Sequence, residues 1–316
     1  MGLEMVTPIT VLCACYQGEK WLPEQLDTLA GQDDPCFSVL LQDDGSSDAT
    51  PSLLREVCGR DPRFRMAAEN GRHFGAAGNF LSLMRQAPEG WCALCDQDDL
   101  WQPDRLSACR QAMEEAEERW GAGTPLLVHS DCRVLAEDGS ELYPGFFAHQ
   151  GWDGAATGLN RLLVQNNVTG CTTLLNAPLR RLVAEHGDAE KIFMHDWLIA
   201  QTAAAFGHIV FVPRPLVGYR QHGTNAVGAS KTGLAKRALQ ALSMPEKARA
   251  RMVLNYRQAR ALRDCYGTLL PAASAEAVDR FLATAELPKL RRLRALRRGG
   301  YLMQSRTLRV GQMIFG

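Results

Sequence analysis

Two groups of acidic residues each come directly after a short apolar run. Asp43 and Asp44 follow FSVLLQ, and the group DQDD at residues 96–99 follows WCALC. Clustered carboxylates repel one another, and they make chemical sense if they hold a divalent cation and sugar hydroxyl groups. Asp-Asp-Gly is also an ordinary turn sequence, so Asp43 and Asp44 alone leave both interpretations open. For residues 96–99 the functional interpretation is favoured.

The elements that position these groups alternate along the first 130 residues. Apolar runs without a helical period predict strands at residues 9–15, 37–42, 64–68, 91–95 and 126–129. Segments with helical spacing begin near residues 21, 51, 79 and 103. This rhythm predicts βαβ units and an α/β fold with a mostly parallel sheet, in which ligands bind at the carboxyl ends of the strands. Both acidic groups fall at such ends.

The pattern changes after residue 130. Residues 140–165 have little periodicity, and two further strands are predicted at 172–175 and 208–212, around a helix that begins near His195. From Lys231 onward only helices are expected. We therefore predict a catalytic domain at residues 1–230 and a basic helical region at 231–316.

Composition is ordinary for a globular protein, with 46% hydrophobic residues in 316. No apolar run approaches the ~18 residues of a membrane span, and no secretion signal is seen, so the expected address is the cytoplasm. Cys92 and Cys95 have the spacing of a zinc knuckle, but a strand would point their thiols to opposite faces. No metal or redox role is expected for them.

Charge is distributed unevenly although the formal net charge is zero. From Lys231 to the end the chain has 18 Lys and Arg against 5 Asp and Glu. Residues 288–298 place Leu290, Leu293 and Leu296 along one side of a helix with arginines elsewhere. This favours contact of residues 288–309 with an anionic membrane surface, and the alternative is a helix packed on the acidic body. Nucleic acid is not expected, because no recognition motif accompanies the charge.

Several motifs in order resemble the family 2 glycosyltransferases, which have the GT-A fold. The matching stretches are VLCACYQGEKWLPEQLDTL, LLQDDGSSDAT, the loop ending AAGNF, ALCDQDDLWQPDRL and MHDWLIA, spread over roughly residues 8 to 225. DQDDLW, QNNVTGCT, HDW and YRQHGTN resemble the rhamnosyltransferase-like branch.

The resemblance implies a donor site and a metal site. Asp44 would bind the pyrimidine base, Asp43 would support the turn, Asp96 would bind ribose, and Asp98 would be the main ligand of Mn²⁺ or Mg²⁺, with Asp99 a less certain neighbour. Many relatives have a hydroxyl residue at Ala14, so one base contact is missing here or is made by backbone. The implied donor-binding residues are Ala14, Tyr16, Asp43, Asp44, Asn79, Asp96 and His222, and the implied metal ligands are Asp98 and His222.

The resemblance also implies that Asp196 is the catalytic base of an inverting transfer, which takes the proton from the acceptor hydroxyl. His195 replaces the glutamate that the wider family has before this aspartate. Without the other motifs, the preferred interpretation of Asp196 would be a charge favoured by a helix N-terminus. The expected acceptor or sugar pocket contains Asn167, Thr169, Gly170, His195 and Trp197.

The expected function is therefore a metal-dependent hexosyltransferase of bacterial surface polysaccharide biosynthesis, with a nucleotide-diphosphate sugar donor and a glycan or lipid-linked glycan acceptor. The favoured donor is dTDP-L-rhamnose, and the alternative is a UDP-hexose, because Asp44 cannot separate thymine from uracil. A nucleotidyltransferase would have a basic glycine-rich loop after the first strand, which is missing. A non-catalytic nucleotide-binding module stays open. Long-chain polymerisation is not expected, since no Gln-x-x-Arg-Trp motif follows Asp196.

Overall fold

The computed structural model describes residues 6–68, 73–222 and 245–315. Three parts of the expected motifs lie outside the described residues: the loop at 70–72, the loop at 223–225 and the start of the basic region at 231–244. The predicted domain boundary at residue 230 lies outside them as well.

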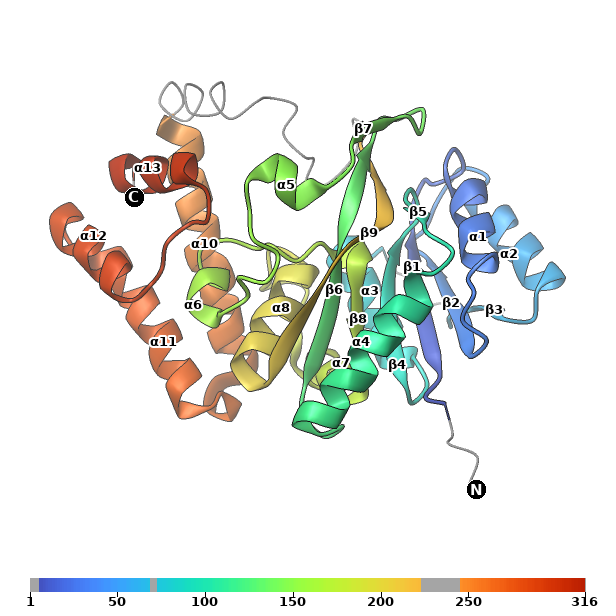
Figure 1. The fold of residues 1–316 in the computed structure, drawn as a ribbon, viewed down its shortest axis with the longest axis horizontal. Coiled ribbons are helices and arrows are strands. Elements are labelled where there is room, and N and C mark those ends of the chain that lie inside the picture. The colour runs from blue at the N-terminus through green and yellow to red at the C-terminus, as the bar shows by residue number, and fades with distance from the viewer. Residues whose placement is uncertain (1–5, 69–72, 223–244, 316) are drawn as a thin grey trace.

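One twisted sheet forms the centre of the molecule, with strands in the order β3-β2-β1-β4-β8-β6-β9-β5 and β7 paired to β6 (Figure 1). The strands β1 to β4 are parallel to one another, whereas β8 is antiparallel to β4 and to β6. The sheet is therefore mixed but mostly parallel, as predicted. Its strands are β1 (Ile9–Cys15), β2 (Phe37–Asp43), β3 (Phe64–Met66), β4 (Trp91–Asp96), β5 (Leu100–Trp101), β6 (Leu126–Leu135), β7 (Glu141–Tyr143), β8 (Thr173–Leu175) and β9 (His208–Arg220).

Alternate side chains of the central strands enter two separate apolar clusters, one on each face of the sheet. Cys92 and Leu94 pack in one cluster, and Ala93 and Cys95 in the other. The two thiols of the CxxC sequence therefore point to opposite faces, as the strand pattern predicted. All ten cysteines are free thiols.

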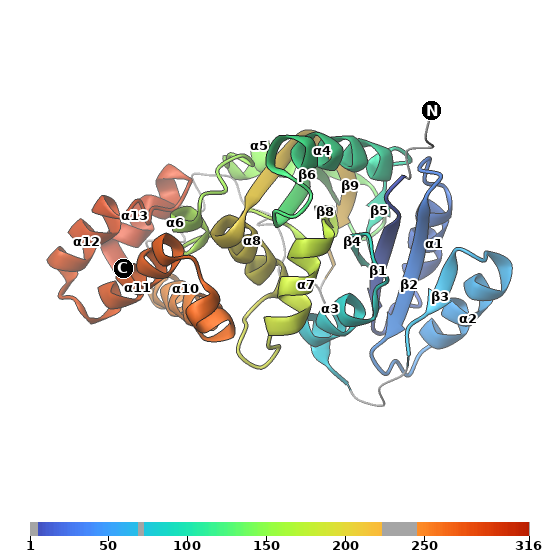
Figure 2. The same cartoon turned by 90° about the horizontal axis from the view of Figure 1, so that it is seen from below.

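Helices cover both faces of the sheet (Figure 2). Apolar residues of α1, α2 and α4 fill one cluster, and those of α3, α7 and α8 fill the other. Three of these helices, α1, α2 and α7, have a proline in the first turn, and α7 also follows Asn176, whose side chain accepts the backbone N–H of Leu179. These helices are α1 (Leu22–Ala30), α2 (Thr50–Arg60), α3 (Gly75–Gln86), α4 (Arg105–Trp120), α7 (Ala177–His186) and α8 (His195–Phe206).

Short elements occupy the region without periodicity. They are α5 (Phe146–Gln150), α6 (Leu159–Leu162) and the 3-10 turn η1 (Gly170–Thr172). The pattern did not predict them, nor the short strands β5 and β7, because these elements depend on partners elsewhere in the chain. The helix α7 was also not predicted.

The C-terminal region is helical, as expected, and lies beside the sheet at the end opposite to β3 (Figure 1). Residues of α10 and α11, among them Leu262 and Phe281, belong to the same apolar cluster as Leu12 of the first strand. A division into two domains stays a prediction, since the described helices share this core. They are α10 (Pro245–Tyr266), α11 (Ala272–Ala283), α12 (Lys289–Arg298) and α13 (Arg306–Phe315), with the 3-10 turns η2 (Gly267–Leu269) and η3 (Thr284–Glu286). Among the described helices none is both long and apolar enough to cross a membrane.

Candidate active site

The two acidic groups meet at the carboxyl edge of the sheet. The strand β1 lies between β2 and β4, and its register places Cys15 opposite Asp43 and Ala14 opposite Asp96. The sheet therefore brings together residues that are 53 positions apart in sequence. Ala14 is half-buried at the centre of this edge and packs toward the apolar cluster on one face.

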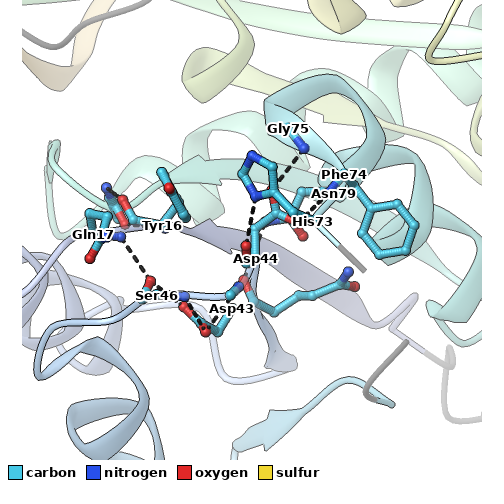
Figure 3. Close-up of polar contacts among 12 residues, drawn as sticks. Tyr16, Gln17, Asp43, Asp44, Ser46, His73, Phe74, Gly75 and Asn79 are labelled. Atoms are coloured by element: carbon cyan, nitrogen blue, oxygen red, sulfur yellow. Dashed lines mark hydrogen bonds and ion pairs between the residues drawn. The ribbon is translucent and has the colours of Figure 1, made fainter. Parts of the chain in front are cut away.

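Asp43 closes the turn after β2 (Figure 3). Its carboxylate accepts the backbone N–H of Gly45 at 3.2 Å and that of Ser46 at 2.9 Å, and the Ser46 hydroxyl at 2.5 Å. The Ser46 hydroxyl in turn accepts the N–H of Gln17 at 2.8 Å. This residue therefore supports the turn and links it to the end of β1.

Asp44 is buried and holds the beginning of α3. Its two carboxylate oxygens accept the backbone N–H groups of Phe74 at 2.7 Å and Gly75 at 2.8 Å (Figure 3). The His73 ring lies 3.0 Å from the same carboxylate. Each carboxylate oxygen has two acceptor positions, so the group can still accept one further donor such as a base N–H.

Two exposed rings border Asp44. Tyr16 and His73 have ring centroids 4.9 Å apart and are about half-exposed. The backbone of Tyr16 is fixed by Gln97, whose side-chain amide accepts its N–H and donates to its carbonyl, both at 2.7 Å. The second residue of the DQDD group therefore ties the end of β1 to the end of β4 and presents the Tyr16 ring to solvent.

Asn79 is buried in the first turns of α3, beside the end of β2. Its side-chain N–H group donates to the Gln42 carbonyl at 3.4 Å, while its side-chain oxygen finds no partner among the described residues. A buried amide oxygen without a partner is unusual in a folded protein. The contact with β2 places Asn79 at the same edge as Asp43.

Asp98 and His222 lie in direct contact across the edge, with Oδ2 and Nε2 2.6 Å apart. The His222 ring stacks on Trp21 with ring centroids 4.0 Å apart. Arg220 precedes it on β9 and donates through Nε to the Asp98 carbonyl at 3.0 Å and through its backbone N–H to Asp99 at 3.1 Å. The end of β9 is therefore fastened to the DQDD group.

Asp96 and Asp99 form a second cluster with Cys171, in which one ligand atom from each residue lies within 4.8 Å of the others. Burial, and then repulsion from Asp98 and Asp196, raises the pKa of Asp96 to about 8. Burial and the same kind of repulsion raise the pKa of Asp99. One oxygen of Asp99 has no hydrogen-bond partner in the described part of the chain.

Asp196 occupies the first turn of α8 and is buried, and its Oδ1 has no partner among the described residues. Burial raises the pKa of Asp196 to about 7, against the opposing effect of the backbone N–H groups of Trp197 and Gly170. The neighbouring His195 stacks on Phe80 with centroids 4.3 Å apart, and burial lowers the pKa of His195 to about 4. The base expected from the sequence is therefore next to a neutral imidazole.

The other residues expected in the acceptor or sugar pocket take part mainly in hydrogen bonds with backbone groups. The indole N–H of Trp197 donates to the Leu162 carbonyl at 2.5 Å, and the Asn167 amide donates to the carbonyl of Asp153 at 3.1 Å. Thr169 precedes η1, and its carbonyl accepts the Thr172 hydroxyl. Of the five residues, Gly170 and His195 are those that lie against Asp196: a Cβ added at Gly170 would lie 3.2 Å from His195 Nε2 and 3.4 Å from Asp196 Cβ.

The residues present fit a divalent cation. Asp96, Asp98, Asp99 and Asp196 gather their carboxylates at one edge, and one oxygen of Asp99 and one of Asp196 are buried without a partner among the described residues. Oxygen ligands with one imidazole suit Mg²⁺ and Mn²⁺. A cation here would relieve repulsion that the protein otherwise bears.

Sequence reasoning missed His73, Gln97 and Cys171 as parts of the site. Gln97 lies inside a motif already singled out, so its position was a usable signal. His73 and Cys171 also lie in stretches singled out for the resemblance, the loop ending AAGNF and QNNVTGCT, but these stretches carry no periodicity that would place the two side chains at the edge.

Comparisons with known proteins agree with this arrangement. Residues 10–124 match the family model of glycosyl transferase family 2. The chain is 25% identical over 233 residues to the dTDP-rhamnosyl transferase RfbG of Shigella flexneri, which covers 71% of this chain and 76% of RfbG. It is 30% identical over 141 residues to the succinoglycan biosynthesis protein ExoO of Rhizobium meliloti, covering 45% of this chain and 36% of ExoO.

The fold is similar to that of S. aureus TarS 1–349, solved in complex with UDP-GlcNAc. The TM-score is 0.53 at 15% identity, over 93% of this chain and 88% of that one. Against a longer TarS structure the chain spans 52% of the protein. Residues 10–124 therefore form a domain of glycosyl transferase family 2, and the chain has a GT-A fold and is similar in sequence to a rhamnosyl transferase.

Proposed function

We propose that the enzyme transfers a sugar, with inversion at the anomeric carbon, from a nucleotide-diphosphate donor to a hydroxyl of a glycan or lipid-linked glycan. The observation that carries this proposal is the buried Asp196 carboxylate, with an oxygen that has no partner among the described residues, close enough to the DQDD group to raise the pKa of Asp96. A base that lies near the edge proposed to bind the diphosphate suits a transfer in which one displacement at the anomeric carbon inverts its configuration.

The favoured donor is dTDP-L-rhamnose. RfbG, which is similar over most of this chain, is described as a dTDP-rhamnosyl transferase. The exposed Tyr16 ring offers a face for the base, and Asp44 keeps one acceptor position for its N–H. A UDP-hexose remains the alternative, because thymine and uracil present the same N–H.

In the transfer, Asp196 takes the proton of the acceptor hydroxyl while the hydroxyl oxygen bonds to the anomeric carbon. The bond from that carbon to the phosphate oxygen breaks, and the nucleoside diphosphate leaves. Mn²⁺ or Mg²⁺, held by Asp98 and His222, would stabilise the charge on the leaving diphosphate when bound. The N–H of Gly170 favours the ionised form of Asp196. The neighbouring His195 is neutral, so it forms no ion pair that would lower the basicity of this carboxylate.

The test combines binding with turnover. Thermal shift against dTDP, UDP, GDP and their sugars, with and without Mn²⁺, is compared between the wild type and Asp98→Ala. A ligand at about 100 times its dissociation constant raises stability by about 2.7 kcal/mol. Metal-dependent stabilisation by dTDP or UDP that Asp98→Ala removes supports the site. Absence of any nucleotide effect contradicts it, and donor binding without hydrolysis or transfer favours the non-catalytic module.

We also propose that the C-terminal helices rest on an anionic membrane surface, where a lipid-linked acceptor would be found. Leu290 of α12 is 72% exposed, and Val310, Met313 and Ile314 of α13 are exposed as well. The two helices meet there, since the Lys289 amine donates to the Ile314 carbonyl at 2.5 Å. From Leu287 to the end the sequence has eight basic residues and no acidic one.

Two interpretations of this segment were open, and the structure bears on both. Leu296 of the predicted stripe on α12 is buried in the apolar core, whereas Leu290 of the same stripe is exposed, so only one end of this side packs inward. The exposed cations do not neutralise the acidic body directly: among the described residues none of them forms an ion pair. They are Lys289, Arg291, Arg294, Arg297 and Arg298. Charge of one sign beside apolar side chains suits anionic lipid.

Vesicle co-sedimentation tests this surface independently of activity. We expect binding to vesicles with anionic lipid, weak binding to neutral phosphatidylcholine, and loss in a variant with Arg291, Arg294 and Arg298 changed to Glu. A control with the exposed Arg55, Arg65 and Arg119 changed to Glu has the same net charge and should still bind. Equal loss in both variants, or no binding to any vesicle, would reject the membrane proposal.

A further inference from the structure

A fully buried arginine donates hydrogen bonds to the backbone at the turn η1. Arg105 is the first residue of α4 and has no exposed surface. Its Nη2 donates to the carbonyl of Cys171 at 2.7 Å and to that of Thr173 at 3.2 Å. Its guanidinium carbon lies 3.4 Å from the centre of the Trp101 ring. The side chain is thus fixed between a ring and two carbonyls.

The turn that Arg105 holds lies against the reacting end of α8. A Cβ at Gly170 would lie 3.4 Å from Asp196 Cβ, so the backbone of η1 sets how closely Asp196 can approach. The Gly170 N–H favours the ionised carboxylate of Asp196, and the Cys171 thiol lies beside Asp96 and Asp99. One short turn therefore contacts both the base and the DQDD group.

Burying the Arg105 guanidinium costs more free energy than packing of an apolar side chain at this position would. Nε and Nη1 of Arg105 have no hydrogen-bond partner among the described residues, and a buried charge without full pairing is unfavourable. Burial lowers the pKa of Arg105, and electrostatic interactions with nearby groups, among them Asp99, only partly oppose this effect. An apolar side chain of the same length would fill the space without this free-energy cost. The presence of arginine therefore indicates that Arg105 has a role in the adjacent active site.

We propose that Arg105 is a positioning residue for the transfer: it holds η1 so that Gly170 fixes the orientation of Asp196. The inference rests on the proposed role of Asp196 as the base. Arg105 does not touch the substrate in this proposal. Its role is to support the base, whereas binding of the donor depends mainly on β1, β2 and α3.

The experiment compares Arg105→Met with Arg110→Met. Arg110 is a matched control, because it is a buried arginine five residues further along α4 that pairs with Asp34 at 2.5 Å, away from η1. We expect Arg105→Met to lower kcat by about 10- to 100-fold more than the control, as small displacements of a reacting group do. The donor KM should stay within about threefold of the wild type, since most of the proposed donor contacts come from β1, β2 and α3 and not from η1. Arg105→Lys, which keeps a donor for both carbonyls, should recover most of the activity.

A pH profile supplies a second readout. If η1 loosens, Asp196 loses the nearby Gly170 N–H, so the acidic limb of kcat/KM should move to higher pH in Arg105→Met and stay in place in Arg110→Met. Equal kcat in the two variants, or a parallel loss of kcat and donor affinity in Arg105→Met alone, would overturn the proposal. If Arg105→Met does not fold, Arg105→Gln is judged by the same criteria.

The base assignment is measured in parallel with Asp196→Asn. Full activity of that variant would reject the proposed base, whatever Arg105 does. A large loss in Asp196→Asn together with a wild-type kcat in Arg105→Met would reject the positioning role and leave the base in place. The two failures are therefore distinguishable.

Discussion

At the residue scale, the proposed transfer depends on a carboxylate that the fold leaves incompletely hydrogen-bonded. Asp196 is buried in the first turn of α8, and its Oδ1 has no partner among the described residues. Burial keeps the ionised form of Asp196 less stable than in water. A base of this kind has the proton affinity needed to accept a hydroxyl proton near neutral pH.

Asp196→Asn should lower kcat by about 10²- to 10⁴-fold and leave donor affinity nearly unchanged, because the proton acceptor is lost while the donor edge is intact. In the wild type the pKa of Asp196 is raised to about 7 by burial. The carboxylate is therefore protonated and inactive below that pH, and kcat/KM should fall as pH decreases through about 7. Initial rates from pH 5 to 9 in both proteins check this. A flat profile in the wild type would contradict the base role.

The DQDD residues were predicted to lie at the edge because their position after a strand is a property of the sequence. The pairing of Asp98 with His222 joins residues 124 positions apart, and no local pattern specifies it. The resemblance to a family assigned a role to His222, whereas it assigned none to Cys171 or His73, although both lie inside its quoted stretches. Reasoning from the sequence therefore located the edge but not all the residues that meet there.

At the scale of elements, α3 is held by a carboxylate from another part of the sheet. The residues before it provide no side-chain cap, and Asp44 accepts the N–H groups of Phe74 and Gly75 instead. An anion at a helix N-terminus is stabilising, and hydrogen bonds to a charged group are stronger than neutral ones. A residue expected to contact a base therefore also fixes the helix that carries Asn79.

Asp44→Ala should destabilise the protein by about 1–3 kcal/mol because two partly buried backbone N–H groups lose their charged acceptor. Donor affinity should fall in the same variant. Urea unfolding and nucleotide titration measure the two effects, with Asp43→Ala as the neighbouring control, whose turn is more exposed. Unchanged stability in Asp44→Ala would show that the helix does not depend on this contact.

Strands and long helices could be predicted because burial of one face or of both faces imposes a regular spacing of apolar residues along the sequence. The seven strands expected from apolar runs are all present. The helix α7 had usable signals in Asn176 and Pro178, which suit a cap and a first turn, yet its short apolar stripe was not recognised. The two-residue strand β5 exists only because Leu100 and Trp101 pair with β9.

At the scale of the whole molecule, the C-terminal helices support the active site. The buried Gln258 of α10 accepts the backbone N–H of Phe193 at 2.9 Å and that of Met194 at 3.3 Å. These residues directly precede His195 and Asp196. Together with the shared apolar core, this contact predicts that the described helices and the sheet unfold in one transition.

Gln258→Leu should lower kcat by about tenfold through displacement of the start of α8, and it should lower stability by about 1 kcal/mol because two partly buried backbone N–H groups lose their acceptor. Asn255→Leu is the control, since Asn255 is buried on the same helix but its amide contacts only a methionine sulfur among its described hydrogen-bond partners. Steady-state kinetics and thermal melts compare the two. A larger kcat loss in the control would contradict the support role.

The contact through Gln258 has a practical consequence for building hybrid enzymes. A designer who joins the N-terminal half of one relative to the C-terminal helices of another would also replace the amide that holds the backbone before the base. Such chimeras should work best when the incoming helix brings an acceptor to this position, or when the join is made after α10, so that Gln258 and α8 are inherited together.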